Sequence, residues 1–277
     1  MTDLSTVLSL SYTKFILGFF LALLVAYLGW RARALSVSGA WAAVLTGGLI
    51  FGLGGLPWAV LLLTFFISSS ALSKAFSRRK AVLNEKFSKG SQRDWEQVLA
   101  NGGLGVGLVL AYTLFPDKDW IWVAFVGAMA AVNADTWSTE VGVLSRKPPR
   151  LITTGKVVES GTSGGITLVG SLAAFLGSLL VGSVAALVFP VLNIPWLIAA
   201  GSIGGLAGSL ADSLLGASVQ GIYTCPSCGK ETERHPLHSC GSQTHHLRGW
   251  RWVNNEVVNF SCSLVGALIA VALWSLV

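Results

Sequence analysis

The stretch VNADTWSTEVG (residues 132–142) closes an apolar run that begins near Trp120, and the interpretation of the whole chain turns on it. It places two carboxylates, Asp135 and Glu140, where a membrane helix is still in or near lipid. Charge is costly at that depth, and acidic residues in such segments usually mark a functional site. We therefore interpret the chain as a membrane protein that keeps a polar site at the end of its helices.

Composition and apolar segments give the fold class. The 277 residues are 53% hydrophobic and 12% charged, whereas soluble domains carry about 25% charged residues. A membrane crossing needs roughly 18 or more apolar residues. We expect an all-α polytopic membrane protein, a single integral membrane domain over residues 1–277 with about eight transmembrane helices. The candidate spans are 13–30, 35–55, 57–73, 98–115, 120–138, 164–189, 195–217 and 255–276.

The distribution of Lys and Arg predicts the topology. The loops after the first, third, fifth and seventh spans hold two, seven, four and four of them, while only Lys14 and Lys118 fall on the other side. Cytoplasmic loops carry such an excess of cations. Both termini are therefore expected outside, and the formal charge of +6 reflects topology rather than nucleic-acid binding.

This topology brings polar residues from four distant segments to the cytoplasmic end of the helices. They are Arg93, Gln97 and Asn101 near the fourth span, Asn133, Asp135, Thr136, Ser138, Thr139 and Glu140 in the fifth, Asp212 and Ser213 in the seventh, and Asn254, Asn255, Glu256 and Asn259 in the eighth. At about 100° per residue, Asp135 and Glu140 lie roughly 140° apart on a straight helix. Either the helix is interrupted, or one acid binds a metal while the other orients a neighbour. A structural pair of hydrogen-bonded carboxylates is the alternative.

The loop SRKPPRLITTGKVVESGTSGG (145–165) has the composition of an anion site. Its last five residues, Gly161, Thr162, Ser163, Gly164 and Gly165, precede the sixth span. Glycines and hydroxyls before a helix offer N–H groups and a positive dipole end. The cations upstream can reach the same anion, and nearby acids can hold Mg²⁺ that bridges its oxygens. The polar residues of this loop that we assign to the site are Arg150, Thr154 and Lys156.

A second cluster of metal-ligand residue types lies within residues 220–252, predicted to be a cytoplasmic insertion between the last two spans. Cys225-x-x-Cys228 forms a metal knuckle that His238 and Cys240 can complete as a structural zinc site. The other three histidines of the segment, His235, His245 and His246, are competing ligands. A redox-active cysteine pair and a segment without metal are the alternatives; the cytoplasmic side disfavours a stable disulfide.

Five stretches together resemble an integral membrane family that was long catalogued as a domain of unknown function. They are QVLANGG (97–103), ADTWSTEVGVLS (134–145), PRLITTGKVVESGTSGG (149–165), LADSLLGASVQ (210–220) and GWRWVNNEVVNF (249–260). The family includes the phytyl-phosphate kinases of vitamin E biosynthesis and animal transmembrane protein 19. Glu256 stands where an Asp is typical of the family.

The resemblance implies phosphoryl transfer from a nucleoside triphosphate, with CTP favoured, to an isoprenoid monophosphate. It implies that Asp135, Glu140 and Asp212 hold Mg²⁺ or nucleotide phosphates, and that Lys156, Arg150 and the 161–165 turn form the phosphate cradle. A lipid-phosphate cytidylyltransferase, a transporter or ion exchanger, and a non-catalytic zinc-bearing scaffold are the competing interpretations. The expected partners are the isoprenoid phosphate, the nucleotide and membrane lipid.

Overall fold

The computed structural model of the chain describes residues 4–80, 86–189 and 193–276, without the side chains of 4–11 and 78–80. Eight long helices lie within these ranges, and seven of them are long and apolar enough to cross a membrane. The elements are α1 (Leu4–Arg31), α2 (Val37–Gly54), α3 (Leu56–Lys80), α4 (Trp95–Leu114), α5 (Asp119–Gly142), β1 (Arg150–Leu151), β2 (Gly165–Ile166), α6 (Leu168–Val188), α7 (Ile194–Ser218), β3 (Ile222–Thr224), β4 (Glu231–Thr232), β5 (His245–Arg248) and α8 (Asn255–Trp274).

The all-helical membrane fold is confirmed, whereas eight crossings and outward termini stay predictions. The helix outside the apolar seven is α5, whose second half carries the amide and acids of the opening stretch. Helix α5 nevertheless lies at the centre of the bundle, where every residue from Ile121 to Ala134 is buried. It packs against α6, α7 and α8 as well as α3 and α4. Protein rather than lipid therefore surrounds this stretch. In the polar end that follows it, Glu140 is buried, whereas residues 135–138 are partly exposed.

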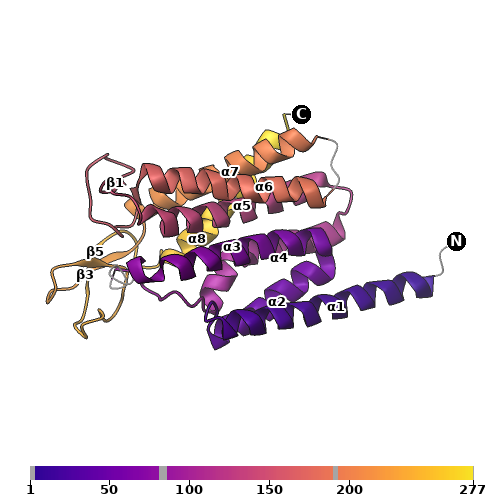
Figure 1. Cartoon of the computed structure of the whole chain (residues 1–277), viewed down its shortest axis with the longest axis horizontal. Helices are drawn as coiled ribbons and strands as arrows, with labels where there is room; N and C mark the ends of the chain where they lie inside the picture. The colour runs from indigo at the N-terminus through magenta and orange to yellow at the C-terminus, as the bar shows by residue number, and fades with distance from the viewer. Residues whose placement is uncertain (1–3, 81–85, 190–192, 277) are drawn as a thin grey trace.

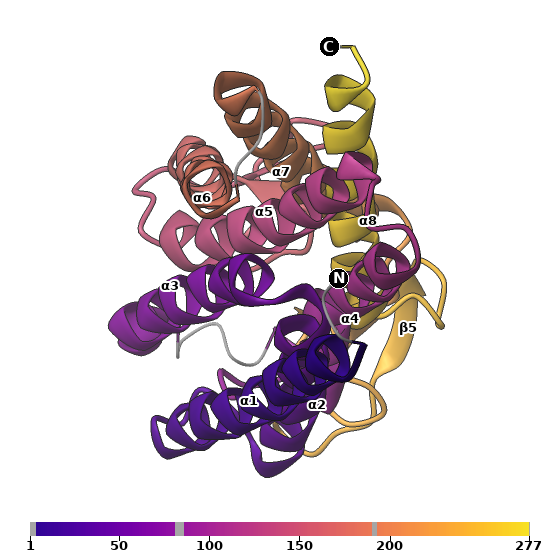
Figure 2. The same cartoon turned by 90° about the vertical axis from the view of Figure 1, so that its right-hand side faces the viewer.

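Two groups of helices are visible in Figure 2, with α1–α4 on one side and α5–α8 on the other. Glycines let α5, α7 and α8 approach closely. A Cβ on Gly208 of α7 would stand 2.7 Å from the carbonyl oxygen of Cys262, and one on Gly205 would stand 2.7 Å from the Cβ of Ala130. The recurrent glycines of the seventh span thus form a packing seam.

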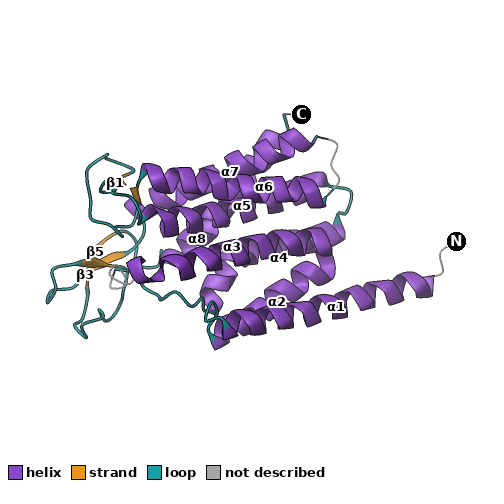
Figure 3. Cartoon of the chain, viewed as in Figure 1, coloured by secondary structure: helices purple, strands orange, loops and turns teal. Residues whose placement is uncertain are grey.

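The short strands gather at one end of the bundle (Figures 1 and 3), which we call the strand-bearing end. Strands β1 and β2 pair antiparallel, and β4-β3-β5 form a three-stranded sheet between α7 and α8. The first turns of α1 and the last turns of α8 lie at the opposite end (Figure 1). This arrangement places the long cation-rich loops together at the strand-bearing end.

Several helix boundaries differ from those expected: α1 begins at Leu4 rather than at 13, and α5 continues beyond 138 to Gly142. Helix α6 begins at Leu168 rather than at 164, because Gly165 and Ile166 are extended and pair with β1 before Thr167 caps the helix. Helix α3 continues beyond 73 to Lys80. The side chains of three cations in the topology prediction, Arg78, Arg79 and Lys80, lie outside the described residues.

Candidate functional site

A polar cavity of about 390 Å³ lies at the strand-bearing end, where loops and helix ends converge. It collects residues from α3, α4, α5, α7 and α8, from the segments at 86–93 and 145–167, and from the segment between α7 and α8, which contributes Glu233. The predicted site residues that line it are Arg93, Asn101, Asp135, Thr136, Ser138, Thr139, Glu140, Gly161, Thr162, Ser163, Gly164, Gly165, Asp212, Ser213, Asn255 and Asn259. The structure therefore unites side chains that are up to about 165 residues apart in sequence.

Two of the acids, Asp135 of α5 and Asp212 of α7, both line the cavity and lie close enough to interact electrostatically. The Oδ2 atom of Asp212 is buried and has no hydrogen-bond partner in the described part of the chain. A buried carboxylate oxygen without a partner is costly, and buried charges are normally paired or bound to a metal. The two carboxylates therefore form a donor set that suits a hard divalent cation such as Mg²⁺.

Glu140 has a different environment from these two acids. Helix α5 continues without interruption to Gly142, so the acid projects toward α3, where its Oε1 accepts a hydrogen bond of 2.8 Å from Ser73. The guanidinium of Arg93 is its charged neighbour. This arrangement matches the alternative in which one acid of the pair orients a neighbouring group.

Arg93 is fixed by contacts to α3 just before α4 begins. Its two terminal nitrogens donate to the hydroxyls of Ser70 and Ser69 at 2.8 and 3.0 Å. The guanidinium also lies over the rings of Phe65 and Phe66, at 5.6 and 5.9 Å from their centroids. Burial lowers the pKa of Arg93, and the nearby Glu140 charge opposes that effect; a guanidinium stays protonated in proteins.

Asn133 lies one turn deeper than the cavity. Its side chain is fully buried, accepts from Ser68 at 2.9 Å and donates to the carbonyl of Gly177 at 2.8 Å. Both functions of the amide are used inside the bundle, where it joins α3, α5 and α6. Its predicted role in binding has no support from the cavity geometry.

The glycine-rich turn packs directly on the end of α7. Gly164 has a φ of 82°, and a Cβ there would stand 2.6 Å from the backbone nitrogen of Ala217. The hydroxyl of Ser163 contacts the Oε1 of buried Gln220 at 2.5 Å, and the Nε2 of Gln220 donates to Glu233 at 3.0 Å. The turn is thus held by close backbone packing and by a chain of side-chain hydrogen bonds that begins in the β4 region.

The structure does not bring the predicted cations of this loop to the cavity. Arg150, Thr154 and Lys156 are exposed and lie outside the lining. Pairing of β1 with β2 turns this part of the loop outward, and Arg150 donates to the carbonyl of Gly155 at 2.8 Å. Their assignment to a phosphate cradle stays a prediction, while Lys147 of the same loop does line the cavity.

Lys89 is the main functional candidate that the sequence did not indicate. It lines the cavity and forms ion pairs with Asp94 at 2.8 Å, with Glu256 at 2.9 Å and with Glu96. Partial burial by itself lowers the pKa of Lys89, but the hydrogen bonds to these three acids outweigh it and raise the pKa above its ordinary value. Glu256 therefore reaches the cavity through Lys89 and is not itself part of the lining.

Charge and ligand geometry distinguish the polar cavity from a simple anion pocket. Four acids line it, Asp135, Glu140, Asp212 and Glu233, against three cations, Lys89, Arg93 and Lys147. Among the described residues, the group of three or more His, Cys, Asp or Glu side chains whose ligand atoms lie within 4.8 Å of one another is Cys225, Cys228, His238 and Cys240, outside this cavity. An anion in the polar cavity would meet more acidic than basic side chains, so a metal ion bound beside it would favour its binding.

A second, apolar cavity of about 240 Å³ adjoins the polar one between α1, α2, α3 and α4. Apolar side chains such as Val25, Phe51 and Leu62 make up most of its lining. Arg93, Gln97 and Asn101 line both cavities. The molecule thus offers a polar and an apolar chamber joined by one cationic and two amide side chains.

Comparison with known proteins places the chain in a family. Residues 20–267 match the family described as "Integral membrane protein DUF92". The chain belongs to the DUF92 family. A DUF92 relative, "Protein PGR" of Arabidopsis thaliana, is 34% identical over 92% of this chain and 94% of its own length.

Two further relatives extend this comparison. "Uncharacterized membrane protein MJ0933" of Methanocaldococcus jannaschii is 32% identical over 88% of this chain and 87% of its own length. "Protein VTE6, chloroplastic" of Arabidopsis thaliana is 26% identical over 86% of this chain and 64% of its own length. No solved structure matches the chain. The DUF92 assignment therefore rests on sequence, and it covers every residue of the polar cavity.

Proposed function

We propose that this protein is a Mg²⁺-dependent phosphotransferase that converts an isoprenoid monophosphate to the diphosphate, with a nucleoside triphosphate, CTP in the first instance, as donor. The observation that carries the proposal is the pair of adjoining cavities that share Arg93, Gln97 and Asn101. A lipid phosphate is an amphipathic molecule, and its head and tail need chambers of opposite character side by side. The resemblance to phytyl-phosphate kinases supports the same substrate class.

The apolar chamber suits the isoprenoid tail. It lies between helices whose apolar side chains face it, with polar groups at the Arg93 end. Because the tail comes from lipid rather than from water, packing contacts with the cavity wall would hold it in place. The guanidinium of Arg93 then lies where the phosphate of the bound lipid enters the polar chamber, and a guanidinium binds phosphate through two parallel hydrogen bonds.

The acids of the polar chamber suit the nucleotide end. Asp135 and Asp212 would hold Mg²⁺, a fit supported by the buried, unpartnered Oδ2 of Asp212. When bound, the ion neutralises phosphate oxygens and helps align them. The backbone N–H groups of the 161–165 turn and the ammonium of Lys147 would contact the same phosphates, while Glu140 keeps Arg93 in place.

In this reaction the residues of the site mainly position the two phosphate groups and neutralise their charge, and proton transfer is secondary. In the transfer, an oxygen of the lipid phosphate forms a bond to the terminal phosphorus of the donor. The bond from that phosphorus to the bridging oxygen breaks, and the nucleoside diphosphate leaves with the electron pair. The lipid phosphate is already ionised near neutral pH, so no strong general base is required. Catalysis of this class is mostly positioning and charge stabilisation.

The proposal is tested with purified protein in detergent, Mg²⁺, a C20 isoprenyl monophosphate, and CTP or ATP in parallel. Lipid products are measured by mass spectrometry. We expect isoprenyl diphosphate with the wild type and with Asp117→Asn, an exposed acid outside both cavities, and none with Asp135→Asn. A nucleotide-linked lipid would instead indicate the cytidylyltransferase. If the nucleotide stays intact with every lipid phosphate, the proposal is wrong and flux measurements for a transporter follow.

A further inference from the structure

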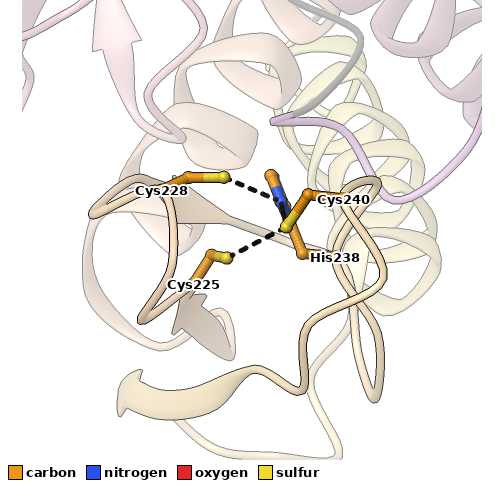
Figure 4. Close-up of side chains that lie close together, drawn as sticks. All are labelled: Cys225, Cys228, His238 and Cys240. Atoms are coloured by element: carbon orange, nitrogen blue, oxygen red, sulfur yellow. Dashed lines mark hydrogen bonds between the residues drawn. The ribbon is translucent and has the colours of Figure 1, made fainter.

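The segment between α7 and α8 carries a compact set of sulfur and nitrogen atoms that the proposed phosphoryl transfer does not use. Cys225, Cys228, His238 and Cys240 converge in Figure 4 from two loops of this segment. All four ligand atoms lie within 4.8 Å of one another. The three cysteines are free thiols rather than disulfides.

Three of the six distances between these atoms lie near those of a tetrahedral metal site. The Sγ atoms of Cys225 and Cys240 are 3.5 Å apart, and Nδ1 of His238 lies 3.2 Å from the Sγ of Cys240 and 3.7 Å from that of Cys228. Zinc bonds of about 2.3 Å to sulfur and about 2.0 Å to nitrogen place tetrahedral ligands roughly 3.5–3.8 Å apart. The side chains therefore already surround a space of the right size, with Nδ1 as the histidine ligand.

The strands around this cluster connect it to the polar cavity. Cys225 directly follows β3, and its N–H donates to the carbonyl of Lys230, just before β4. The residue that follows β4 is Glu233, which lines the cavity. Its carboxylate accepts from Gln220, which contacts Ser163 of the glycine-rich turn, and from the backbone N–H of Ser88 at 3.3 Å. The Glu233 side chain thus connects the end of β4 to the loop that contains Ser88 and, through Gln220, to the glycine-rich turn.

From this geometry we infer that Cys225, Cys228, His238 and Cys240 bind one structural zinc ion, and that the ion fixes Glu233 as a positioning residue for the glycine-rich turn. Four protein ligands leave no open position, which is the pattern of structural rather than catalytic zinc. The strands here are only two to four residues long. Such short strands have little stability of their own, so the metal supplies the constraint that keeps Glu233 near Gln220 and Ser88.

Metal analysis of the full-length protein tests the first part. We expect about one zinc per chain, lost in His238→Ala and kept in His245→Ala, which changes an exposed histidine outside the cluster. If His238→Ala does not fold, zinc is removed from the wild type with a chelator and then added back. Zinc-free wild-type protein that takes up no zinc overturns the inference, as does full zinc content in His238→Ala.

Hydrogen exchange tests the link to the cavity without any measurement of catalysis. Removing zinc should speed amide exchange in peptides covering 86–92 and 158–166, and adding it back should restore protection. Peptides from α5, which pack in the core away from the segment, serve as the internal control. The positioning role is wrong if zinc leaves and both loop peptides keep their protection. This result does not depend on whether the protein transfers phosphate.

Discussion

The two cavities are built in opposite ways. The polar one is lined by five helices and three connecting segments, and hydrogen bonds and ion pairs hold its side chains. The apolar one is enclosed by four neighbouring helices that follow one another along the chain, with few polar groups in its wall. Hydrogen bonds fix direction, whereas apolar packing is non-directional and scales with area. The difference indicates that the polar cavity aligns the reacting phosphate groups, while the apolar cavity accepts isoprenoid tails of different length.

The largest expected effect is confined to the polar chamber. Asp212→Asn keeps the size of the side chain and removes the charge that faces Asp135. We expect the rate of diphosphate formation to fall about 100-fold or more, comparable to losing one electrostatic transition-state contact. Binding of the lipid phosphate alone should change little. Loss of lipid binding in this variant would mean that the two cavities do not bind the nucleotide and the lipid tail independently.

A substitution of Arg93, which lines both cavities, can distinguish its contribution to stability from its contribution to binding of the lipid phosphate. Arg93→Gln removes the charge next to Glu140, a side chain that is only 4% exposed. We expect destabilisation of about 2 kcal/mol from the group left without compensation, together with a raised KM for the lipid phosphate. Thermal unfolding in detergent and steady-state kinetics measure the two effects.

A double substitution distinguishes charge from shape at this position. Adding Glu140→Gln to Arg93→Gln should recover part of the stability, because neither charge is then left alone. The raised KM should remain, since the guanidinium for the phosphate is still absent. If the stability and the KM for the lipid phosphate recover together, the Arg93–Glu140 pair has a structural role and does not bind the phosphate.

Most of the polar chamber could be predicted from sequence because topology alone places helix ends. Once the cation-rich loops are assigned to one side, Asp135, Asp212 and Asn255 must reach the same depth. The positions of the other lining residues depend on strand pairing and side-chain packing, which topology does not predict. The β1–β2 pairing turns Arg150 and Lys156 outward. The positive-inside pattern accounts for a lysine at position 89, but it does not indicate that three carboxylates contact Lys89.

The apolar chamber could not be predicted from the sequence. Helices α1–α4 expose large apolar side chains such as Phe20, Trp41, Ile67 and Leu110. Because a membrane helix is apolar toward lipid and toward its neighbours alike, its pattern does not reveal which faces leave a space. The missed helix boundary at 164–168 has a similar cause, since the glycines there permit an extended pairing that hydropathy does not detect.

A smaller effect is expected in the apolar chamber alone. Ala43→Phe adds a ring to its wall, whereas Leu45→Phe on the same helix changes a side chain that is exposed and outside the cavity. Excluding part of the tail from the cavity should raise the KM for a C20 substrate a few-fold through lost packing contacts, with a smaller change for a C5 substrate. Equal losses for both chain lengths would contradict the assignment of this chamber to the tail.

The smallest effect is expected outside both chambers, at the ion pair between Lys86 and Glu159, whose atoms are 2.7 Å apart. The hydrogen bond and charge of Lys86 lower the pKa of Glu159. A lowered carboxyl pKa stabilises the folded protein above the ordinary value of about 4.3 and ceases to do so as the pH falls through the folded value. Glu159→Gln should therefore lower the Tm slightly at about pH 7, and the difference should shrink as the pH falls below about 4. Glu231→Gln, at another exposed glutamate, serves as the control. A pH-independent difference would show that the Glu159 side chain acts through packing rather than through its charge.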